Sequence, residues 1–319
     1  MKGAMIRVEA LTRRFGDAVA VDAIGFEVAR GEVLALVGTS GCGKSTTLRM
    51  INRLIEPDKG RVEIAGRDAR EMAPDALRRG IGYVIQGVGL FPHWTVARNI
   101  STVPRLLGWD RSRIAARVDE LLELFGFDPA EAGPKYPAAL SGGQQQRIGV
   151  ARAMAAEPEI LLMDEPFGAL DPVTRARLQD EFTAIRRRSG LTAIIVTHDM
   201  DEAFRLADRI AVMDAGRILQ IDTPERLLRG PREGFVRQFV GLDDRALRIL
   251  SLHRVRELAR PAPDAPAPAQ WVAPDDTLRE AASRLIWEGG EALAVVEADR
   301  VTGEIRAEDI WRVGTRGAA

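Results

Sequence analysis

A glycine-rich run at residues 38–45, GTSGCGKS, has the residue types and spacing of a phosphate-binding loop. Its three glycines let the backbone bend towards anionic oxygens, and the N–H groups at the start of the next helix then point at them. Lys44 can reach the outer phosphates and the Ser45 hydroxyl can hold Mg²⁺. The alternative is a glycine-rich turn with an incidental lysine, but all eight positions of the P-loop pattern are met. We predict phosphate binding by Gly38, Thr39, Ser40, Gly41, Cys42, Gly43, Lys44, Ser45 and Thr46.

A second candidate element is the run ILLMDEP at residues 160–166, in which two carboxylates follow an apolar strand. Asp164, at the strand end, is placed to reach the Mg²⁺ held by Ser45 through water. Glu165 comes one residue later and can polarise a water that attacks the terminal phosphate, as a general base does. The alternative is an acidic turn after a strand, which the complete P-loop disfavours.

The third element is LSGGQ at residues 140–144, where a serine and two glycines again open a helix. A helix N-terminus of this kind is a second anion site. One nucleotide does not need two such sites from a single chain. When two copies face each other, however, each can supply its P-loop to one nucleotide and its LSGGQ to the other. We therefore predict a head-to-tail dimer with nucleotide in both seams, bound by Ser141, Gly142, Gly143 and Gln144 of the opposite copy. Taken alone, Ser-Gly-Gly would be an ordinary loop.

The elements that must position these residues alternate between strands and helices. Strands are expected at 5–10, 19–28, 61–64 and 81–85, with a turn at 15–17, and a hairpin at 210–213 and 218–221. The runs 160–163 and 193–196 are apolar without alternation, as in strands buried on both faces of a parallel sheet. Helical patterns cover 45–54, 96–125, 145–156 and 172–189. This order predicts an α/β domain.

Composition limits the alternatives. The chain has 319 residues, 46% hydrophobic and 29% charged, with net charge −1, so no bulk electrostatic argument favours nucleic acid as a partner. Cys42 is the single cysteine, which excludes an internal disulfide and fits a reducing compartment. No signal-peptide pattern and no apolar run of membrane-spanning length is visible, so we expect any membrane role to come through a partner.

The C-terminal part changes in composition. Residues 245–260 suggest a helix rich in Arg and Leu, and 261–268, PAPDAPAP, suggest a semi-stiff linker. A small module follows, with a strand, a helix at 277–288, strands at 292–297 and 301–305, and a short helix. We therefore expect a domain at 1–240, a helix and linker at 241–269, and the small α+β module at 270–319.

The three motifs in this order resemble the ATPase subunits of ABC transporters, over about residues 5–228. The resemblance implies a P-loop NTPase fold with a helical subdomain, hydrolysis of ATP to ADP and phosphate with Mg²⁺, and a homodimer. It implies that Phe15 stacks on adenine, although core packing is its alternative role, and that Gln86 contacts Mg²⁺ and water. It further implies that residues 168–171, ending at Asp171, contact the opposite subunit and that His198 senses the γ-phosphate. His93 and His253 match no motif.

Residues 46–57, TTLRMINRLIEP, and 83–100, YVIQGVGLFPHWTVARNI, are more specific. They resemble ATPase subunits of bacterial importers for quaternary ammonium osmoprotectants, namely glycine betaine, carnitine, choline and proline betaine. The resemblance implies a peripheral position on the cytoplasmic face of the inner membrane, a permease partner and an extracytoplasmic solute-binding protein. Leu90, Phe91 and Trp94 would suit permease docking, or would be core residues. Gly87 departs from the polar residue expected in close relatives.

The small module at 270–319 resembles one CBS repeat, where relatives with this architecture often carry two. A structural or dimer-stabilising role is favoured over nucleotide sensing, because the module offers no phosphate cradle. Other functions also stay open: import of a different small solute such as an amino acid, a soluble ABC protein acting on nucleic acid or ribosomes, or ATP sensing without turnover. The chain has a single cassette and no basic patch, which disfavours a protein that acts on nucleic acid or ribosomes. The presence of both Glu165 and His198 disfavours ATP sensing without turnover.

Overall fold

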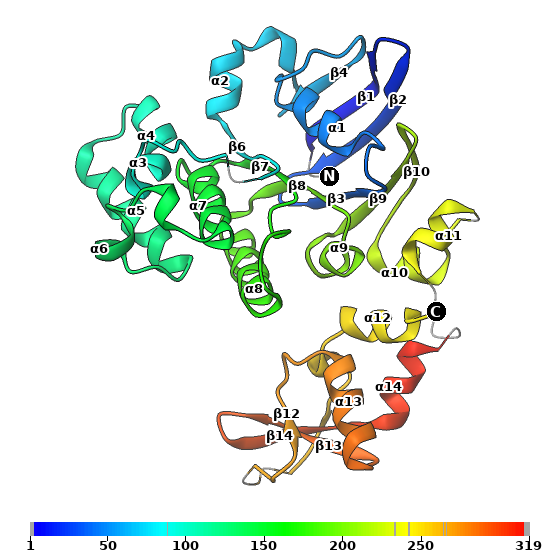
Figure 1. Ribbon diagram of the computed structural model, residues 1–319. Helices are drawn as coiled ribbons and strands as arrows, with labels where there is room; N and C mark the ends of the chain where they lie inside the picture. Colours follow the sequence, from blue (N-terminus) through cyan, green and yellow to red (C-terminus); the bar gives the residue numbers. More distant parts are fainter. Residues whose placement is uncertain are drawn as a thin grey trace. The chain divides into compact units, whose positions relative to one another are not determined.

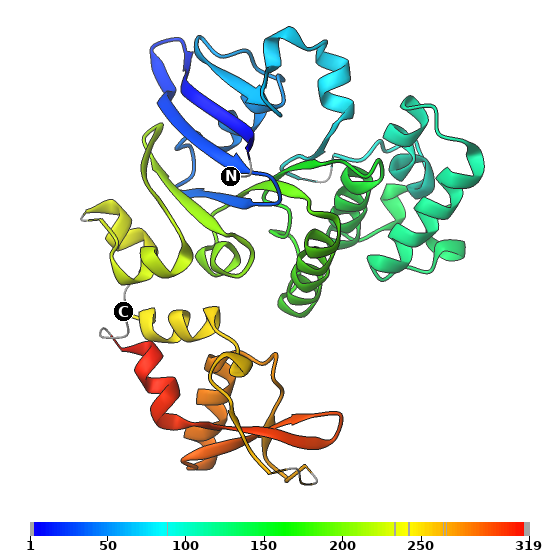
Figure 2. The ribbon, with the colours of Figure 1, turned by 180° about the vertical axis from the view of Figure 1, so that it is seen from behind.

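The computed structural model describes residues 3–87, 89–232, 234–241, 243–263, 265 and 267–315. Its chain contacts divide it into two compact units, Met1–Ile221 and Asp222–Ala319. We expected the first domain to extend to residue 240, and the difference arises because helix α10 packs against α12, within the second unit. Figures 1 and 2 show the units from opposite sides.

A six-stranded sheet with the order β10-β9-β3-β8-β7-β6 organises the first unit. The pairings of β3 with β8 and β9, and of β7 with β6 and β8, are parallel. Strands β3, β7 and β8 are buried along their whole length, which confirms the parallel sheet predicted from their unbroken apolar runs. The strands are β3 (Val33–Gly38), β6 (Ile81–Val84), β7 (Ile160–Asp164), β8 (Thr192–Thr197), β9 (Arg209–Asp214) and β10 (Arg217–Asp222).

A second sheet of four strands, in the order β2-β1-β4-β5, is antiparallel (Figure 1). Its first two strands are longer than predicted and meet at a tight turn, residues 16–17. Leu48, Met50 and Ile51 of helix α1 belong to one hydrophobic cluster with residues of both sheets, so α1 connects their facing sides. The strands are β1 (Ala4–Phe15), β2 (Ala18–Ala29), β4 (Lys59–Ile64) and β5 (Arg67–Asp68).

Polar side chains cap the N-termini of helices α3, α5, α6, α7, α8 and α9 of the first unit. Asp110 accepts from the backbone N–H of Arg113 and starts α5, so the helical pattern predicted across 96–125 is three helices instead of one. Helix α8 has the predicted bounds, between the Asp171 cap and Gly190 in the left-handed region. The helices are α1 (Lys44–Ile51), α2 (Pro74–Arg79), α3 (Val96–Ile100), α4 (Thr102–Leu106), α5 (Arg111–Leu124), α6 (Pro129–Ala132), α7 (Gly142–Met154), α8 (Pro172–Ser189) and α9 (Met200–Leu206), with 3₁₀ turns at Ala69–Glu71 and Pro137–Ala139.

The second unit is a small sheet, in the order β11-β14-β13-β12, with helices beside it. Two predictions were wrong there. The helix expected over 245–260 ends at Leu252. The expected linker begins as strand β11, which pairs with β14. In addition, the Val301 N–H donates to the Ala265 carbonyl at 2.8 Å. The elements are α10 (Pro224–Arg229), α11 (Phe235–Val240), α12 (Arg245–Leu252), a 3₁₀ turn (Val255–Glu257), β11 (Arg260–Pro261), β12 (Trp271–Val272), α13 (Leu278–Glu288), β13 (Ala292–Glu297), β14 (Arg300–Arg306) and α14 (Ala307–Gly314).

The hydrophobic core of the second unit confirms the order of elements predicted for 270–313. Leu278 and Leu285 of α13 pack with Leu293 and Val295 of β13 and Ile305 of β14.

Across the described residues of both units, every helix is too short or too polar to cross a lipid bilayer.

Candidate active site

Four neighbouring strands of the large sheet end at one edge, and each is followed by a predicted site residue. The parallel registers of β3, β8, β7 and β6 bring their carboxyl ends to the same level. The P-loop (38–45) follows β3, His198 follows β8, Glu165 follows β7, and Gln86 lies two residues after β6. Ligand sites of open α/β sheets lie at this edge of the strands.

The backbone of the P-loop needs glycine at two positions. Gly43 has φ +105°, and a Cβ there would collide with the backbone carbonyl of Ala20. Gly38 has φ +151°, and a Cβ would collide with the backbone carbonyl of Met213. Residues 39–41 at the tip of the loop are exposed, which leaves this part of the backbone open to a ligand.

Lys44 is buried although it carries a charge. Its Nζ donates to the carbonyl oxygens of Gly38 at 2.9 Å and Thr39 at 2.8 Å, and it lies 3.7 Å from the Cys42 sulfur. Burial raises the pKa of the Cys42 thiol, which makes Cys42 a packing residue and not a reactive thiolate. The ammonium group is therefore fixed at the mouth of the loop, where outer phosphate oxygens can replace the carbonyls.

Ser45 and Asp164 join the P-loop to the end of β7. The Ser45 hydroxyl donates to Oδ1 of Asp164 at 2.9 Å, while Oδ2 of this carboxylate is buried and has no hydrogen-bond partner among the described residues. Burial raises the pKa of Asp164, which is only 1% exposed, and the Ser45 hydrogen bond opposes that effect.

A hydroxyl and an incompletely satisfied carboxylate suit Mg²⁺, which takes few protein ligands and completes its shell with water and phosphate oxygens. The residues therefore fit the predicted metal. The described residues contain no group of three or more His, Cys, Asp and Glu side chains that would hold an ion without a nucleotide.

Glu165 and His198 face each other across neighbouring strands. His198 Nδ1 lies 3.2 Å from Glu165 Oε1, and the Glu165 backbone N–H donates to the Val196 carbonyl at 2.9 Å. Glu165 has φ +50°, a conformation that is uncommon for a residue with a side chain. Both residues directly follow strands that end at the same edge of the sheet, and the His198 side chain is 63% exposed.

Among the described residues, no hydrogen bond joins Gln86 to Ser45 or Asp164. Strand β6 ends at Val84 and not at Ile85 as predicted, so Gln86 lies in the following loop. Its side chain is exposed and forms no hydrogen bond to another described residue. Its role as an Mg²⁺ ligand stays a prediction.

Phe15 lies at the end of β1 and is 48% exposed, so its alternative role as a core residue was wrong. The guanidinium carbon of Arg13 lies 4.9 Å from the ring centroid. An exposed aromatic ring beside a fixed cation is a suitable surface for stacking a base. Thr46, the last residue of the predicted phosphate-binding set, is half-buried in α1.

The two elements predicted to reach the opposite subunit are ordered by helix caps. Ser141 Oγ accepts from the Gln144 backbone N–H at 3.3 Å and Gln144 Oε1 accepts from the Ser141 N–H at 2.9 Å. Asp171 caps α8, and the hydrogen bond from Thr174 lowers the pKa of its carboxyl. Among the described residues no hydrogen bond joins 140–144 to the P-loop.

Gln146, which was not among the predicted site residues, connects helix α7 to Glu165 and to the loop at 168–171. The buried side chain of Gln146 donates from Nε2 to the Glu165 carbonyl at 2.8 Å and accepts at Oε1 from the Ala169 N–H at 2.9 Å. Its only sequence signal is its place two residues after LSGGQ, at the end of the run of three glutamines.

Another missed residue is Glu202, buried behind His198, whose Oε2 accepts from the Thr197 hydroxyl at 3.2 Å. Burial raises the pKa of Glu202 to about 7. Nothing in its sequence surroundings separates it from an ordinary helix-surface glutamate, so only packing could reveal it.

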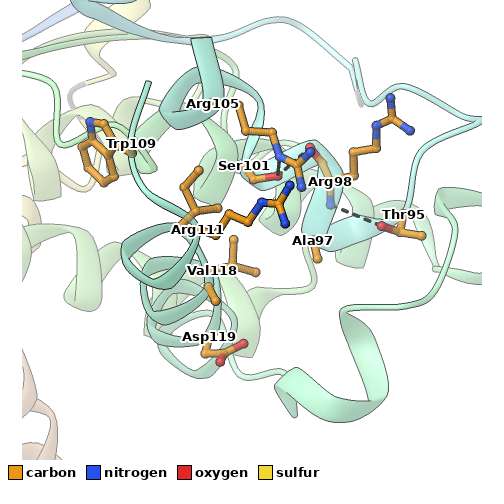
Figure 3. Close-up of a pocket in the computed structure, with 11 residues that line it drawn as sticks. Thr95, Ala97, Arg98, Ser101, Arg105, Trp109, Arg111, Val118 and Asp119 are labelled. Carbon is orange, nitrogen blue, oxygen red and sulfur yellow. Dashed lines mark hydrogen bonds between the residues drawn. The ribbon is translucent and has the colours of Figure 1, made fainter. Parts of the chain in front are cut away.

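A pocket of about 820 Å³ lies on the helical segment of α3, α4 and α5 (Figure 3). Arg98, Arg105 and Arg111 line it, and Arg105 Nε donates to the Ser101 hydroxyl at 3.1 Å. None of the predicted site residues lines this pocket, so it is separate from the P-loop site.

The fold and the P-loop site define a P-loop nucleoside triphosphatase. Residues 21–168 match the family model described as "ABC transporter". The chain is 49% identical over 292 residues to the glycine betaine uptake system ATP-binding protein YehX of Escherichia coli, covering 92% of this chain and 94% of that protein. It is 46% identical over 298 residues to the glycine betaine/carnitine/choline transport ATP-binding protein OpuCA of Bacillus subtilis, covering 93% and 77%.

Among known structures, the fold is similar to the dimeric, post-hydrolysis ATP-binding cassette MJ0796 bound to ADP and Pi. The TM-score is 0.64 at 29% identity, covering 69% of this chain and 99% of that one. This chain belongs to the ABC transporter family, as one of its ATP-binding subunits.

Proposed function

We propose that this chain hydrolyses ATP to energise a bacterial importer of quaternary ammonium osmoprotectants such as glycine betaine, carnitine, choline and proline betaine. The observation that carries the ATPase part is the arrangement of Lys44, Ser45, Asp164, Glu165 and His198 at one edge of the parallel sheet. The solute class is supported by the names of the similar glycine betaine, carnitine and choline transport subunits of E. coli and B. subtilis.

In the proposed reaction the P-loop N–H groups and Lys44 bind and orient the phosphates. Ser45 and Asp164 would hold Mg²⁺, which neutralises phosphate charge when bound. Glu165 accepts a proton from the attacking water, and His198, 3.2 Å from that carboxylate, fixes its direction towards the phosphate. Gln86, two residues after β6, would complete the metal surroundings.

The working form is proposed to be a head-to-tail homodimer. Ser141 to Gln144 of one copy would face the ATP held by the P-loop of the other, and Asp171 would lie at the same interface. The dimeric form of the similar cassette MJ0796 supports this arrangement. The adenine would stack on Phe15.

The loop after Gln86 is proposed to receive a cytoplasmic segment of the permease. Asn99 is fully buried and hydrogen-bonds both the N–H and the C=O of Phe91, at 2.8 and 3.1 Å, which fixes the backbone at Phe91. Phe91 is 39% exposed and its ring lies 4.4 Å from that of Trp94. A groove of about 420 Å³, lined in part by Tyr83, Phe91 and Val103, offers an apolar docking surface. Leu90 and Trp94 are half-buried.

The subunit would thus lie on the cytoplasmic face of the inner membrane through its permease, with a solute-binding protein outside. The C-terminal unit, proposed as a single CBS-like repeat, would stabilise the dimer. Its helix α13 exposes Ile286 and Trp287, the latter 89% exposed, which suits contact with a second copy.

The experiment compares uptake in a host strain that lacks this gene, complemented with the wild type, Glu165→Gln or empty vector. Labelled glycine betaine, choline, sulfate and an amino acid are supplied at high salt. We expect betaine or choline uptake only with the wild type. Uptake of sulfate or the amino acid instead would refute the solute class, and loss of ATPase activity in purified Glu165→Gln checks the enzymatic part separately.

A further inference from the structure

Gln146 uses both ends of its side-chain amide. Nε2 donates to the backbone carbonyl of Glu165 at 2.8 Å, and Oε1 accepts from the backbone N–H of Ala169 at 2.9 Å. The residue is 6% exposed, so neither hydrogen bond competes with bulk water. A buried amide with both hydrogen bonds made is a strong geometric constraint, because breaking either leaves a buried polar group unpaired.

The constraint acts on a strained residue. Glu165 has φ +50° and is not glycine, a conformation that persists only where the surrounding structure holds it. Three hydrogen bonds meet at its backbone: its N–H donates to the Val196 carbonyl at 2.9 Å, and its own carbonyl accepts from Gln146 Nε2 at 2.8 Å and from the Gly168 N–H at 3.4 Å. Removing the Gln146 contact would leave this carbonyl only the longer bond from Gly168, so the peptide after Glu165 could rotate and the carboxylate would move with it.

The loop at 168–171 is anchored from a second side. Arg175 donates to the Leu170 carbonyl at 3.1 Å and pairs with Asp199 at 3.3 Å. Asp199 directly follows His198 and caps α9. A continuous set of contacts therefore runs from α7 through Gln146 to Glu165 and loop 168–171, and from that loop to the His198 segment.

We propose that Gln146 is a positioning residue that couples LSGGQ at the start of α7 to Glu165, so that ATP bound by LSGGQ at one interface sets the geometry of the base working at the other. The inference rests on the proposed head-to-tail ATPase dimer. Gln146 lies on the same rigid helix as Gly142 and Gly143, one turn beyond them, so a shift of the helix start reaches the Glu165 carbonyl directly.

Two variants separate this role from packing. Gln146→Leu removes both hydrogen bonds, and Gln146→Glu keeps the acceptor for Ala169 but replaces the donor to Glu165. We expect kcat for ATP to fall about 10- to 100-fold in both, with KM within about threefold, as for loss of a catalytic orientation. A buried glutamate next to a carbonyl has a raised pKa, so its protonated form can donate and the activity of Gln146→Glu relative to wild type should rise as the pH falls.

ATP binding at the dimer interface is measured separately in the Glu165→Gln background, where ATP-induced dimerisation is followed by light scattering. The Gln146 variants are expected to dimerise at ATP concentrations within about threefold of that background, because the residue touches no predicted ligand group. Equal losses of kcat, dimerisation and thermal stability would instead make Gln146 a packing residue and overturn the proposal, as would kcat within twofold of wild type.

The matched control is Gln179→Glu, which also puts a carboxylate at a buried glutamine, on α8. Among the described residues Gln179 has no hydrogen bond to Glu165 or to loop 168–171. The Gln179→Glu variant should lower the melting temperature about as much as Gln146→Glu does, but its activity should not recover as the pH falls. Purified Glu165→Gln serves as the standard for an inactive enzyme. If it retains ATPase activity, the proposed ATPase mechanism fails. The Gln146 variants test the positioning role only when Glu165→Gln is inactive.

Discussion

The Ser45 hydroxyl and the Asp164 carboxylate are 2.9 Å apart, although 119 positions separate them in the chain. This contact joins the P-loop to the end of β7 and leaves Asp164 Oδ2 as a buried oxygen that no other described residue hydrogen-bonds. The pairing has a measurable consequence for the metal dependence of the protein.

Asp164→Asn should abolish Mg²⁺-dependent ATP hydrolysis, by about 100-fold or more, because an amide supplies no charge to the metal. Binding of ATP in the presence of chelator should stay within about threefold of wild type, since the P-loop and Lys44 are unchanged. Fluorescent-nucleotide titrations with and without Mg²⁺ measure both. Equal metal enhancement in variant and wild type would contradict the assignment of Asp164.

Phe15→Ala should weaken ATP binding about tenfold without lowering stability, because the ring is half exposed and its stacking surface is available to a base. Phe15→Trp should restore binding. Nucleotide titration and thermal unfolding of the two variants give the answer. A fall in melting temperature with unchanged affinity would return Phe15 to a packing role.

Gly43→Ala should remove ATP binding, because φ +105° and the Ala20 carbonyl leave no room for a Cβ. Gly80→Ala is the control: Gly80 ends α2 outside the left-handed region, and its Cβ would only reach ordinary contact with the Leu77 carbonyl. We expect the control to bind ATP as the wild type does. Full binding by Gly43→Ala would show that the loop adopts another backbone path.

Glu202 predicts a pH dependence of stability. Its pKa is about 7 in the folded protein against an ordinary 4.5, chiefly because of burial, with Asp199 raising it and Arg175 and Thr197 lowering it. Since the folded state retains the proton more strongly, the stabilising contribution is full below 4.5 and disappears as the pH rises to about 7. The difference is on the order of 3 kcal/mol.

Glu202→Gln carries no such charge. Between about pH 5 and about pH 8 the wild type should lose roughly 5–10 °C more in melting temperature than the variant. Thermal unfolding at the two pH values, with Glu280→Gln as an exposed control, tests this. Parallel curves for wild type and Glu202→Gln would mean that the carboxylate is ionised at no cost in the folded protein.

The P-loop, the carboxylates after β7 and the histidine after β8 were predictable because each follows an apolar run that can only be a buried parallel strand. Helix α8 was predictable at both ends because Asp171-Pro172 and Gly190 are strong boundary signals. Strand β11 was not, because backbone pairing at Arg260–Pro261 leaves no trace in a segment composed mainly of proline and alanine.

The contacts of Gln146 and Glu202 escaped for a different reason. Each depends on the distance between elements that are far apart in the chain, and a glutamine or glutamate on a helix usually faces solvent. For Gln86 the reverse holds. The sequence motif identifies this residue, but its position relative to Ser45 could not be predicted because Gln86 lies in a loop and not in a strand.

Lys44 already has hydrogen-bond acceptors before any nucleotide arrives, because the Gly38 and Thr39 carbonyls receive its ammonium group. Nucleotide arrival is therefore an exchange of one set of oxygen acceptors for another, and not the first neutralisation of an isolated buried charge. After phosphate and ADP depart, the same carbonyls can take the ammonium group back. The emptied subunit can consequently wait between turnovers with its most buried cation still satisfied, and resetting the site needs no unfolding of the loop.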